Sequence, residues 1–330
     1  MKILIIGATG FIGKHLVREL VKKNKVKCLV RETSKKSDIK FLSNLGADIC
    51  YGDVLDKKSL ERAMKNIDAV FNLAGGGYIA ATFKKGYEEL RKNNVESAQN
   101  VFEIAAKSHV KRIVHFSSIS AMGIIVEQEL NESSLCKPET PHEVCKFETE
   151  QIAEKYKRDM LITIIRPGIV YGPYGLNSEI LQLSRIMKKH FFIIPGNGKN
   201  IMPWVYVDDV VNATIIAFEK NEKSCEKFII VSDPQPTFNE LADSIKNNLN
   251  IKVLIIHIPR FLFVFVGYIF EFFGNLFGFA PVLNLVRARS MTSNRIYKIE
   301  KIKNMGYKQN SNLNDSMKKT IEWYKENGYL

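Results

Sequence analysis

Three glycines near the start of the chain have the spacing of a phosphate-binding loop. They lie in the run Gly7-Ala8-Thr9-Gly10-Phe11-Ile12-Gly13, which follows an apolar strand and opens a helix. Glycine lets the backbone turn sharply and approach a pyrophosphate closely, and the amides at the helix N-terminus then face the anion. Together with the strand before it and the helix after it, the run predicts a dinucleotide site.

The residues after the second expected strand bear on which dinucleotide is bound. That strand ends at Val30, and Arg31 follows it, with Lys35 and Lys36 close behind. A site that prefers NAD usually offers Asp or Glu to the ribose 2′-hydroxyl, whereas a guanidinium suits a 2′-phosphate. Arg31 therefore predicts a preference for NADP, and Glu32 leaves NAD as the alternative.

The elements that must position these residues follow an alternating pattern over the first half of the chain. Apolar runs indicate strands at 3–6, 26–30, 47–51, 69–73, 113–116 and 161–165, and helical patterns lie between them, for example at 11–23, 59–65, 87–107 and 143–157. Strands that alternate with helices predict an α/β fold of the Rossmann type, a doubly wound parallel sheet covered on both faces.

The pattern loosens after Arg166 and predicts a second unit. Helices are expected at 180–189 and 238–249 and near the C-terminus, and strands at 204–207, 228–231 and 253–258. Asp208 or Asp209 is expected to N-cap the helix that runs through Glu219. We therefore expect an NAD(P)-binding domain over residues 1–170 and a smaller substrate-binding lobe over residues 171–330, folded against the first domain rather than independent of it.

Residues 261–286 are rich in Phe, and Glu271 is their only charged residue. Neither uncharged run beside it reaches the ~20 residues of a membrane-spanning helix. The pattern predicts a pair of apolar helices broken near Gly274–Gly278. We interpret them as a buried core of the lobe or a subunit interface. The alternative is a peripheral membrane contact, and hence a membrane-associated protein. In that case three cations would lie at lipid headgroups, namely Arg260, Arg287 and Arg289.

Composition and charge exclude several classes of protein. Lys plus Arg number 48 against 35 Asp plus Glu, a formal net charge of +13, but no arginine-rich tract or basic recognition helix accompanies the excess. We expect no nucleic-acid partner. The 5 cysteines lack C-x-x-C or metal-ligand spacing, which predicts a reduced, cytoplasmic protein without a metal site. The apolar run at 3–6 is too short for a signal peptide.

With these features in view, the chain resembles the extended short-chain dehydrogenase/reductase family, also called the NAD-dependent epimerase/dehydratase family. The resemblance covers nearly the whole chain, and its ordered motifs are far more specific than the glycine loop alone. Beyond GATGFIG at 7–13 they are GDV at 52–54, NLAG at 72–75, Asn94, VKRIVHFSSISAMG at 110–123, RPGIVYGP at 166–173 and VYVDD at 205–209.

The resemblance implies an NAD(P)-binding Rossmann domain, a smaller lobe for a small-molecule substrate, and a homodimer. Thr9, Phe11 and Ile12 are expected to join the glycines around the pyrophosphate. Asp53 and Val54 correspond to the residues that flank the adenine in the family, and Leu73, Ala74 and Gly75 to those that line the ribose and the nicotinamide. Pro167 and Ile169 correspond to the residues that reach the carboxamide.

By the same resemblance, catalysis uses Ser or Thr followed by Tyr-x-x-x-Lys. Ser118 lies five residues before Gly123, where the family places its hydroxyl, and Lys146 is followed by Glu150 as in the family. Lys146 is also expected to hold the nicotinamide ribose hydroxyls. The tyrosine should occupy position 142, where this chain has His142. The expected catalytic residues are therefore Ser118, His142 and Lys146.

The histidine leaves two interpretations. In the first, His142 replaces the phenol as general acid/base, because it lies one helical turn before Lys146 and a nearby ammonium keeps the imidazole neutral. The protein then oxidises or reduces a secondary alcohol or ketone. In the second, the proton relay is lost and the protein binds NADP without redox turnover. We prefer the first interpretation.

The substrate class is indicated by two local features. Nucleotide-sugar members of the family usually carry an arginine shortly before VYVDD, and the stretch Asn200–Trp204 has none. The Phe-rich segment is similar to the 3-beta-hydroxysteroid dehydrogenase branch, which acts on hydrophobic alcohols. The main expectation is therefore a sterol- or isoprenoid-like substrate, and the alternative is a nucleotide-sugar epimerase or dehydratase.

Overall fold

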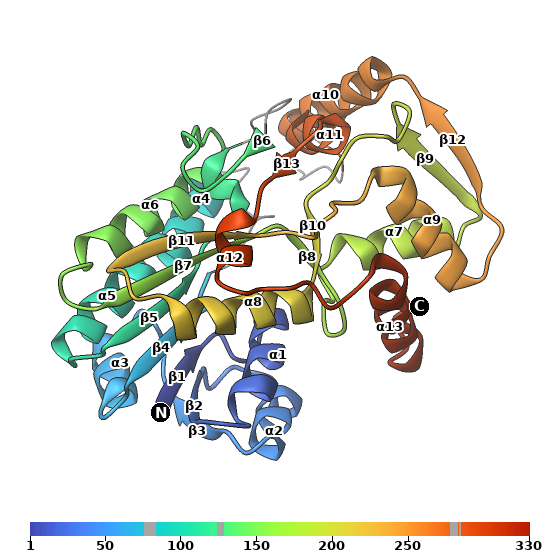
Figure 1. The fold of residues 1–330 in the computed structure, drawn as a ribbon. Coiled ribbons are helices and arrows are strands. Elements are labelled where there is room, and N and C mark those ends of the chain that lie inside the picture. Colours follow the sequence, from blue (N-terminus) through green and yellow to red (C-terminus); the bar gives the residue numbers. More distant parts are fainter. Residues whose placement is uncertain (76–83, 124–128, 278–282, 284) are drawn as a thin grey trace.

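The fold is built on one parallel sheet of seven strands, as Figure 1 shows. The computed structural model describes residues 1–75, 84–123, 129–277, 283 and 285–330. The strand order is β11-β7-β5-β4-β1-β2-β3, with every pairing parallel. The order reverses on either side of β1, as in a doubly wound sheet, so the predicted fold class is confirmed. The strands are β1 Lys2–Ile6, β2 Lys25–Val30, β3 Asp48–Tyr51, β4 Ala69–Asn72, β5 Arg112–Phe116, β7 Leu161–Pro167 and β11 Cys225–Ile230.

Helices cover both faces of this sheet because its strands are apolar on both sides. In β1, Ile3 and Ile5 pack in one core and Leu4 and Ile6 in the other. The first core lies under α1 (Phe11–Leu20) and α8 (Val207–Lys220), and the second lies under α3 (Lys57–Met64), α5 (Ser97–Lys107) and α6 (Pro141–Lys155). The helix α2 (Lys36–Asn44) lies between β2 and β3 in the chain.

The expected helix over residues 87–107 is interrupted. The structure has α4 (Lys84–Arg91), a π-helical turn at Lys92–Glu96, and then α5. Asn94 lies in this turn, and its side-chain amide donates to the Leu90 carbonyl at 2.9 Å. Such π-turns are rare and frequently occur near functional sites.

The chain returns to the main sheet after residue 170. α8 packs against α1, and β11 pairs with β7 as the seventh strand. α8 and β11 lie beyond residue 170 in the chain but pack with the Rossmann domain. The predicted boundary at residue 170 stays a prediction. The predicted N-cap of α8 is wrong, because the helix already begins at Val207 with Tyr206 as its N-cap. Asp208 instead contacts His15 and Arg18 of α1.

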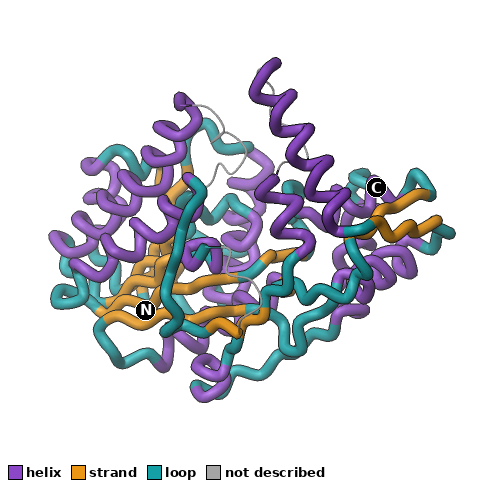
Figure 2. The backbone as a smooth tube through the Cα atoms, turned by 90° about the horizontal axis from the view of Figure 1, so that it is seen from above, coloured by secondary structure: helices purple, strands orange, loops and turns teal. Residues whose placement is uncertain are grey.

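Most of the remaining elements form the smaller lobe, with its own core around Trp204, Phe238 and Tyr324. They include the pairs β8 (Ile169–Tyr171) with β10 (Trp204–Tyr206) and β9 (Phe191–Pro195) with β12 (Leu254–Ile258), and the helices α7 (Glu179–Met187), α9 (Phe238–Leu249) and α13 (Leu313–Glu326). The short pair β6 (Glu129–Leu130) with β13 (Ile296–Tyr297) and the helix α12 (Glu300–Asn304) instead pack on the core that lies under α1 and α8. In Figure 2 the ribbon of β9 and β12 stands apart from the main sheet.

The Phe-rich segment forms the predicted helices, but most of its large side chains are exposed. α10 runs over Arg260–Phe277 and α11 over Leu285–Thr292. Phe261 is 70% exposed and Phe277 69% exposed. The interpretation of α10 as a buried core is therefore wrong. Residues 278–282 and 284 and the Arg287 side chain lie outside the described parts of the chain. Within the described chain, no helix is long and apolar enough to span a membrane.

Candidate active site

The glycine loop between β1 and α1 is closely packed in a way that requires its glycines. Gly7 has φ +84°, and the Gly10 amide donates to the Gly7 carbonyl at 3.0 Å. A Cβ on Gly13 would lie 2.3 Å from the Gly7 carbonyl oxygen and 2.9 Å from the Ala8 Cα. Gly10 is the N-cap of α1 and supplies no side chain there. The helix N-terminus is therefore open to an anion, and these residues fit the pyrophosphate of a dinucleotide.

This loop lies where the strand order reverses. The Leu73 amide donates to the Ile6 carbonyl at 2.9 Å, and a Cβ on Gly7 would lie 3.0 Å from the Leu73 backbone. The loop after β1 and the residues Leu73, Ala74 and Gly75 after β4 are thus side by side at the carboxyl edge of the sheet. A crevice at this position is where doubly wound sheets bind their ligands.

The other predicted cofactor residues surround the same edge. Arg31 is exposed directly after β2. Asp53 accepts from the Leu55 amide at 2.8 Å, so one of its carboxylate oxygens closes a local turn, and Val54 packs on the core beside Ala74. Pro167 is the last residue of β7 and Ile169 is the first residue of the next strand, and the Ile169 amide donates to the Pro203 carbonyl at 2.7 Å.

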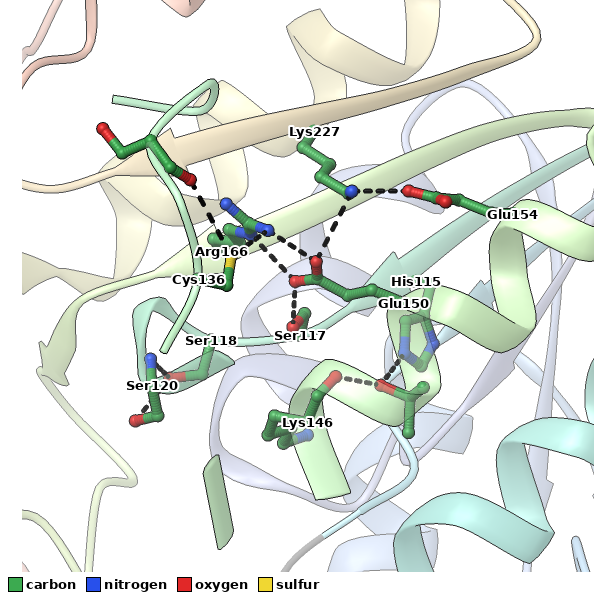
Figure 3. Close-up of polar contacts among 12 residues, drawn as sticks. His115, Ser117, Ser118, Ser120, Cys136, Lys146, Glu150, Glu154, Arg166 and Lys227 are labelled. Atoms are coloured by element: carbon green, nitrogen blue, oxygen red, sulfur yellow. Dashed lines mark hydrogen bonds and ion pairs between the residues drawn. The ribbon is translucent and has the colours of Figure 1, made fainter. Parts of the chain in front are cut away.

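The serines after β5 have different surroundings. Ser117 is buried and donates to Glu150 Oε1 at 2.6 Å, so its hydroxyl is committed to that carboxylate. Ser118 is partly exposed and N-caps a short 3₁₀ helix at Ile119–Met122 by accepting from the Ser120 amide at 3.1 Å. Figure 3 shows Ser117 directed to Glu150 and Ser118 to Ser120. Ser118 is thus the more accessible hydroxyl of the two.

A buried ion pair fixes the helix α6 against β7. Glu150 accepts two hydrogen bonds from Arg166, at 2.6 and 2.8 Å, and both side chains are 1% exposed. Two buried charges are tolerated only when they are paired and hydrogen-bonded in this way. The pair therefore fixes the part of α6 that lies one turn after Lys146.

Lys146 lies between the ends of β4 and β5. Its Nζ donates to the Phe116 carbonyl at 3.4 Å, and a Cβ on Gly75 would lie 3.2 Å from it. Burial lowers the pKa of Lys146 to about 8, although Glu150 acts in the opposite direction. The ammonium is thus held beside the loop that is expected to contact the nicotinamide ribose, which suits a donor to ribose hydroxyls.

His142 precedes Lys146 by one turn in the first turn of α6. Thr140 and Glu143 form a capping box that starts this helix, and Glu143 is 6% exposed. Burial, and then the charge of Lys146, lower the pKa of His142 to about 4. The imidazole is therefore neutral near pH 7 and able to accept a proton.

A buried hydrogen-bond chain joins the cofactor loop to α6. Thr149 Oγ1 donates to the Lys146 carbonyl at 2.8 Å, so it accepts from Nε2 of His115, which lies 3.0 Å away. His115 Nδ1 then accepts from the Asn72 amide nitrogen at 3.3 Å, and the Asn72 oxygen accepts from the Ala74 amide at 3.1 Å. Burial, followed by the charge of Lys146, lowers the pKa of His115 to about 3. This chain holds a neutral imidazole close to Lys146, and Figure 3 shows His115 and Lys146 near each other.

An apolar pocket of about 940 Å³ lies between the start of α6 and α10. Thr140 and Glu143 at the start of α6 line one wall, and α10 supplies Phe261 and Phe265 on the other. The pocket is also lined by Glu139, Arg260, Val264, Tyr268, Arg289 and Ser293. Its walls thus combine apolar side chains with two guanidinium groups and two carboxylates. The apolar walls suit an apolar ligand, and the guanidinium groups can bind an anionic group on it.

Sequence reasoning missed three parts of this site. The buried residues Asn72 and His115 lie within strands; both fall inside the motifs NLAG and VKRIVHFSSISAMG, but the sequence did not indicate the hydrogen bond between them. Arg295 is 8% exposed, its Nη2 lies 4.0 Å from Met202 Sδ, and its Nε has no hydrogen bond to any described atom. A guanidinium therefore does lie beside the stretch before VYVDD, but it comes from a distant part of the chain. The capping box at Thr140 was the one available signal, a Thr-x-x-Glu pattern before α6.

No group of three or more His, Cys, Asp or Glu side chains within the described ranges is placed to hold a metal ion.

Comparison with known proteins identifies relatives of two kinds. The chain is 23% identical over 325 residues to N-acetyl-alpha-D-glucosaminyl-diphospho-ditrans,octacis-undecaprenol 4-epimerase of Escherichia coli O157:H7, covering 97% of this chain and 94% of that one. It is 25% identical over 348 residues to a decarboxylating sterol-4-alpha-carboxylate 3-dehydrogenase of Saccharomyces cerevisiae, covering 98% of both.

Solved structures show the same fold. A UDP-glucose 4-epimerase from Thermotoga maritima, solved with UDP-glucose, superposes with a TM-score of 0.78 at 24% identity and covers 99% of both chains. A UDP-glucuronic acid 4-epimerase mutant from Bacillus cereus, solved with NAD and a fluorinated UDP-sugar, superposes with a TM-score of 0.79 at 20% identity over 99% of both chains.

The family itself is established by a sequence model. The model described as the NAD dependent epimerase/dehydratase family matches residues 3–231, which include the glycine loop, Ser118, His142, Lys146 and the β11 strand. The resemblance noted from the sequence motifs is confirmed, and with it a nicotinamide adenine dinucleotide as the class of cofactor. The chain belongs to the NAD-dependent epimerase/dehydratase family.

Proposed function

We propose that the protein oxidises or reduces a secondary alcohol carbon on a substrate that combines a large apolar body with an anionic group. The observation that carries this proposal is the pocket between α6 and α10. Its apolar walls come from side chains such as Phe261 and Phe265, and it contains Arg260 and Arg289. Thr140 and Glu143, which lie within two residues of His142 in the chain, also line it. An apolar body fits the walls, and an anionic group is bound by guanidinium.

The expected roles of the catalytic groups follow from their protonation states. The neutral imidazole of His142 takes the hydroxyl proton as the alcohol is oxidised, and returns it as a ketone is reduced. Ser118 donates a hydrogen bond to the same oxygen, which stabilises the charge that develops on it. The nicotinamide, when bound, supplies the hydride acceptor or donor. Lys146 holds the ribose hydroxyls. Burial, assisted by the charge of Lys146, lowers the pKa of His142 and keeps it neutral.

An anionic group on the substrate is also supported by the relatives. The relatives from E. coli and S. cerevisiae act, by their names, on a diphospho-undecaprenol and on a sterol carboxylate. Each of these substrates joins an apolar body to an anionic group.

Among the two nicotinamide dinucleotides, we propose that NADP is preferred. Arg31 is exposed at the end of β2, where a 2′-phosphate would lie, and Lys35 is exposed close to it. An arginine there forms charge-assisted hydrogen bonds with a phosphate. NAD remains the alternative, and a direct comparison of the protein's affinities for NADP and NAD distinguishes the two. The homodimer stays a prediction.

The substrate class is tested by following the absorbance of the reduced nicotinamide with three kinds of alcohol. They are an apolar alcohol with a carboxylate or diphosphate, the same alcohol without the anion, and a water-soluble UDP-sugar. We expect turnover with the first, turnover reduced at least about tenfold with the second, and none with the third. Turnover of the UDP-sugar alone would favour the nucleotide-sugar alternative and contradict the proposal.

The role of His142 is tested by a pair of substitutions. His142→Phe should abolish turnover while the affinity for the nucleotide stays nearly unchanged, and His142→Tyr should retain turnover because a phenol is the family's own acid/base. His109→Asn, at an exposed position, is the control and should behave as the unaltered protein. Unchanged turnover in His142→Phe would remove the residue from the mechanism. Nucleotide binding without turnover of any substrate would support the binding-only alternative.

A further inference from the structure

The helix α10 presents apolar side chains to its surroundings over an unusually wide arc. At roughly 100° per residue, the positions of its exposed apolar side chains cover about 200°. They are Phe261, Leu262, Phe265, Val266, Tyr268, Ile269, Phe270, Phe272, Phe273, Leu276 and Phe277. A surface helix normally keeps its apolar stripe for the core and turns polar residues outward. α10 reverses this arrangement along 18 residues, a length of about 27 Å.

The one charged residue after Arg260 in this helix is turned away from that arc. Glu271 lies on the packed side with Gly267 and Gly274, and its carboxylate accepts from the Leu285 amide at the start of α11 at 2.9 Å. The charge is thereby used to cap α11. The exposed side chains described between 261 and 277 carry no charge.

A second apolar surface leads into α10. In the β9–β12 ribbon, Phe191 is paired with Leu254 and Ile193 with Ile256, and all of them are exposed. The alternate residues of β9 are buried, so the four side chains lie on the outer face of the ribbon. β12 is followed by Pro259, whose carbonyl accepts from the first turn of α10. In Figure 1 the ribbon and α10 both lie along the upper edge of the smaller lobe.

The two stretches of chain that form most of these surfaces carry only positive charges. Neither 188–207 nor 250–270 contains Asp or Glu, although the first contributes elements of the ribbon and the second contributes the ribbon and most of α10. Both stretches carry cations, and these are exposed: Lys188, Lys189, Lys199, Lys252 and Arg260. The chain as a whole has a formal net charge of +13. The complementary surface must therefore be anionic as well as apolar.

We propose that α10 and the outer face of the β9–β12 ribbon dock on the anionic surface of a lipid bilayer. Acyl chains can surround an arc of about 200°, and anionic headgroups neutralise the flanking cations. α10 lies in the plane of the interface instead of crossing it. A second copy of the chain fits these observations less well, because a two-fold contact would bring the same cations face to face.

The proposal is tested by flotation of the full chain with vesicles of phosphatidylcholine alone or mixed with phosphatidylglycerol. We expect the protein to float with the mixed vesicles, and the bound fraction to fall as salt is raised. The triple variant Phe272→Ser, Leu276→Ser, Phe277→Ser should bind at least about tenfold more weakly. These positions are exposed and do not line the pocket. Lys189→Glu with Lys252→Glu should weaken binding to the mixed vesicles selectively.

The control variant carries Leu135→Ser and Leu176→Ser, two exposed apolar positions outside the docking surface. It should float as the unaltered protein does, and nucleotide affinity reports that each variant is folded. Absence of flotation with the mixed vesicles at low salt would overturn the proposal, as would equal flotation of the triple variant. A dimer in light scattering that the triple variant dissociates, without flotation of either protein, would assign the surface to a second copy instead.

Discussion

The buried imidazole of His115 makes the stability of the protein depend on pH in a way that one substitution removes. Its Nδ1 accepts from Asn72, so a proton at Nδ1 would face a donor in a buried site. The pKa of His115 is lowered from 6.5 to about 3. Between these values the unfolded chain binds a proton that the folded chain does not, so stability falls as pH falls from 6.5 towards 3.

The size of the effect at pH 5 depends mainly on the ordinary pKa of histidine. Protonation of the histidine at pH 5 stabilises the unfolded state by RT ln(1 + 10^1.5), which is about 2 kcal/mol. It stabilises the folded state by almost nothing as long as the pKa of His115 in the folded protein stays well below 5. His115→Gln removes this contribution. A glutamine can accept from Asn72 and donate to Thr149, so the hydrogen-bond chain is kept while the titration is lost.

The assay is urea unfolding at pH 8, 7, 6 and 5, followed by circular dichroism. We expect the unfolding free energy of the unaltered protein to fall by about 2 kcal/mol more than that of His115→Gln between pH 8 and pH 5. His109→Asn, which changes an exposed histidine, should follow the unaltered protein. Parallel losses in the unaltered protein and in His115→Gln would refute the reasoning, because they would mean that His115 titrates equally in both states.

Three further predictions concern the glycine loop, the nucleotide preference and the buried ion pair. Gly13→Ala should weaken nucleotide binding by roughly tenfold or more, because the added methyl would lie 2.3 Å from the Gly7 carbonyl oxygen. Arg31→Ala should weaken binding of NADP by about tenfold and leave NAD almost unchanged. Glu150→Gln should lower the unfolding free energy by about 3–5 kcal/mol, because the Arg166 charge is then buried without its partner. Calorimetric titration with each nucleotide checks the first two, and urea unfolding at neutral pH checks the third.

Each of these predictions has its own contrary outcome. For the glycine loop it is unchanged affinity in Gly13→Ala. For the nucleotide preference it is an equal loss for both dinucleotides, and Lys40→Ala, an exposed cation on α2, is the control that should change neither. For the ion pair it is a loss no larger than that of Glu154→Gln, which removes an exposed carboxylate of the same helix.

The parts of the fold that sequence reasoning predicted are those that local patterns determine. The strands of the first half follow from short apolar runs, and the glycine loop follows from spacing that few other structures require. α9 begins and ends at the predicted residues because Thr237 caps it in the pattern Thr-x-x-Glu and Asn250 ends it in a left-handed conformation. These signals lie within a few residues of the feature that they determine.

The parts that sequence reasoning did not predict depend on contacts between distant segments. Arg295 reaches the stretch before VYVDD from more than ninety positions away, as its contact with Met202 shows. The pocket arises only where α6 and α10 face each other. α10 itself has the composition of a core helix, and an apolar composition does not distinguish a helix that the chain buries from one that it leaves exposed.

The return of the chain to the main sheet has a consequence for how the protein can be divided. β11 follows α7, the first helix of the smaller lobe, in the chain, yet it pairs with β7 from Ile162 to Pro167. A fragment that ends at residue 170 would leave the β11 side of β7 as an unpaired strand edge, which could pair with strands of other molecules and cause aggregation. Residues 1–170 are therefore not expected to fold as a separate domain, and a chimaera that contains the cofactor-binding half must also include α8 and β11.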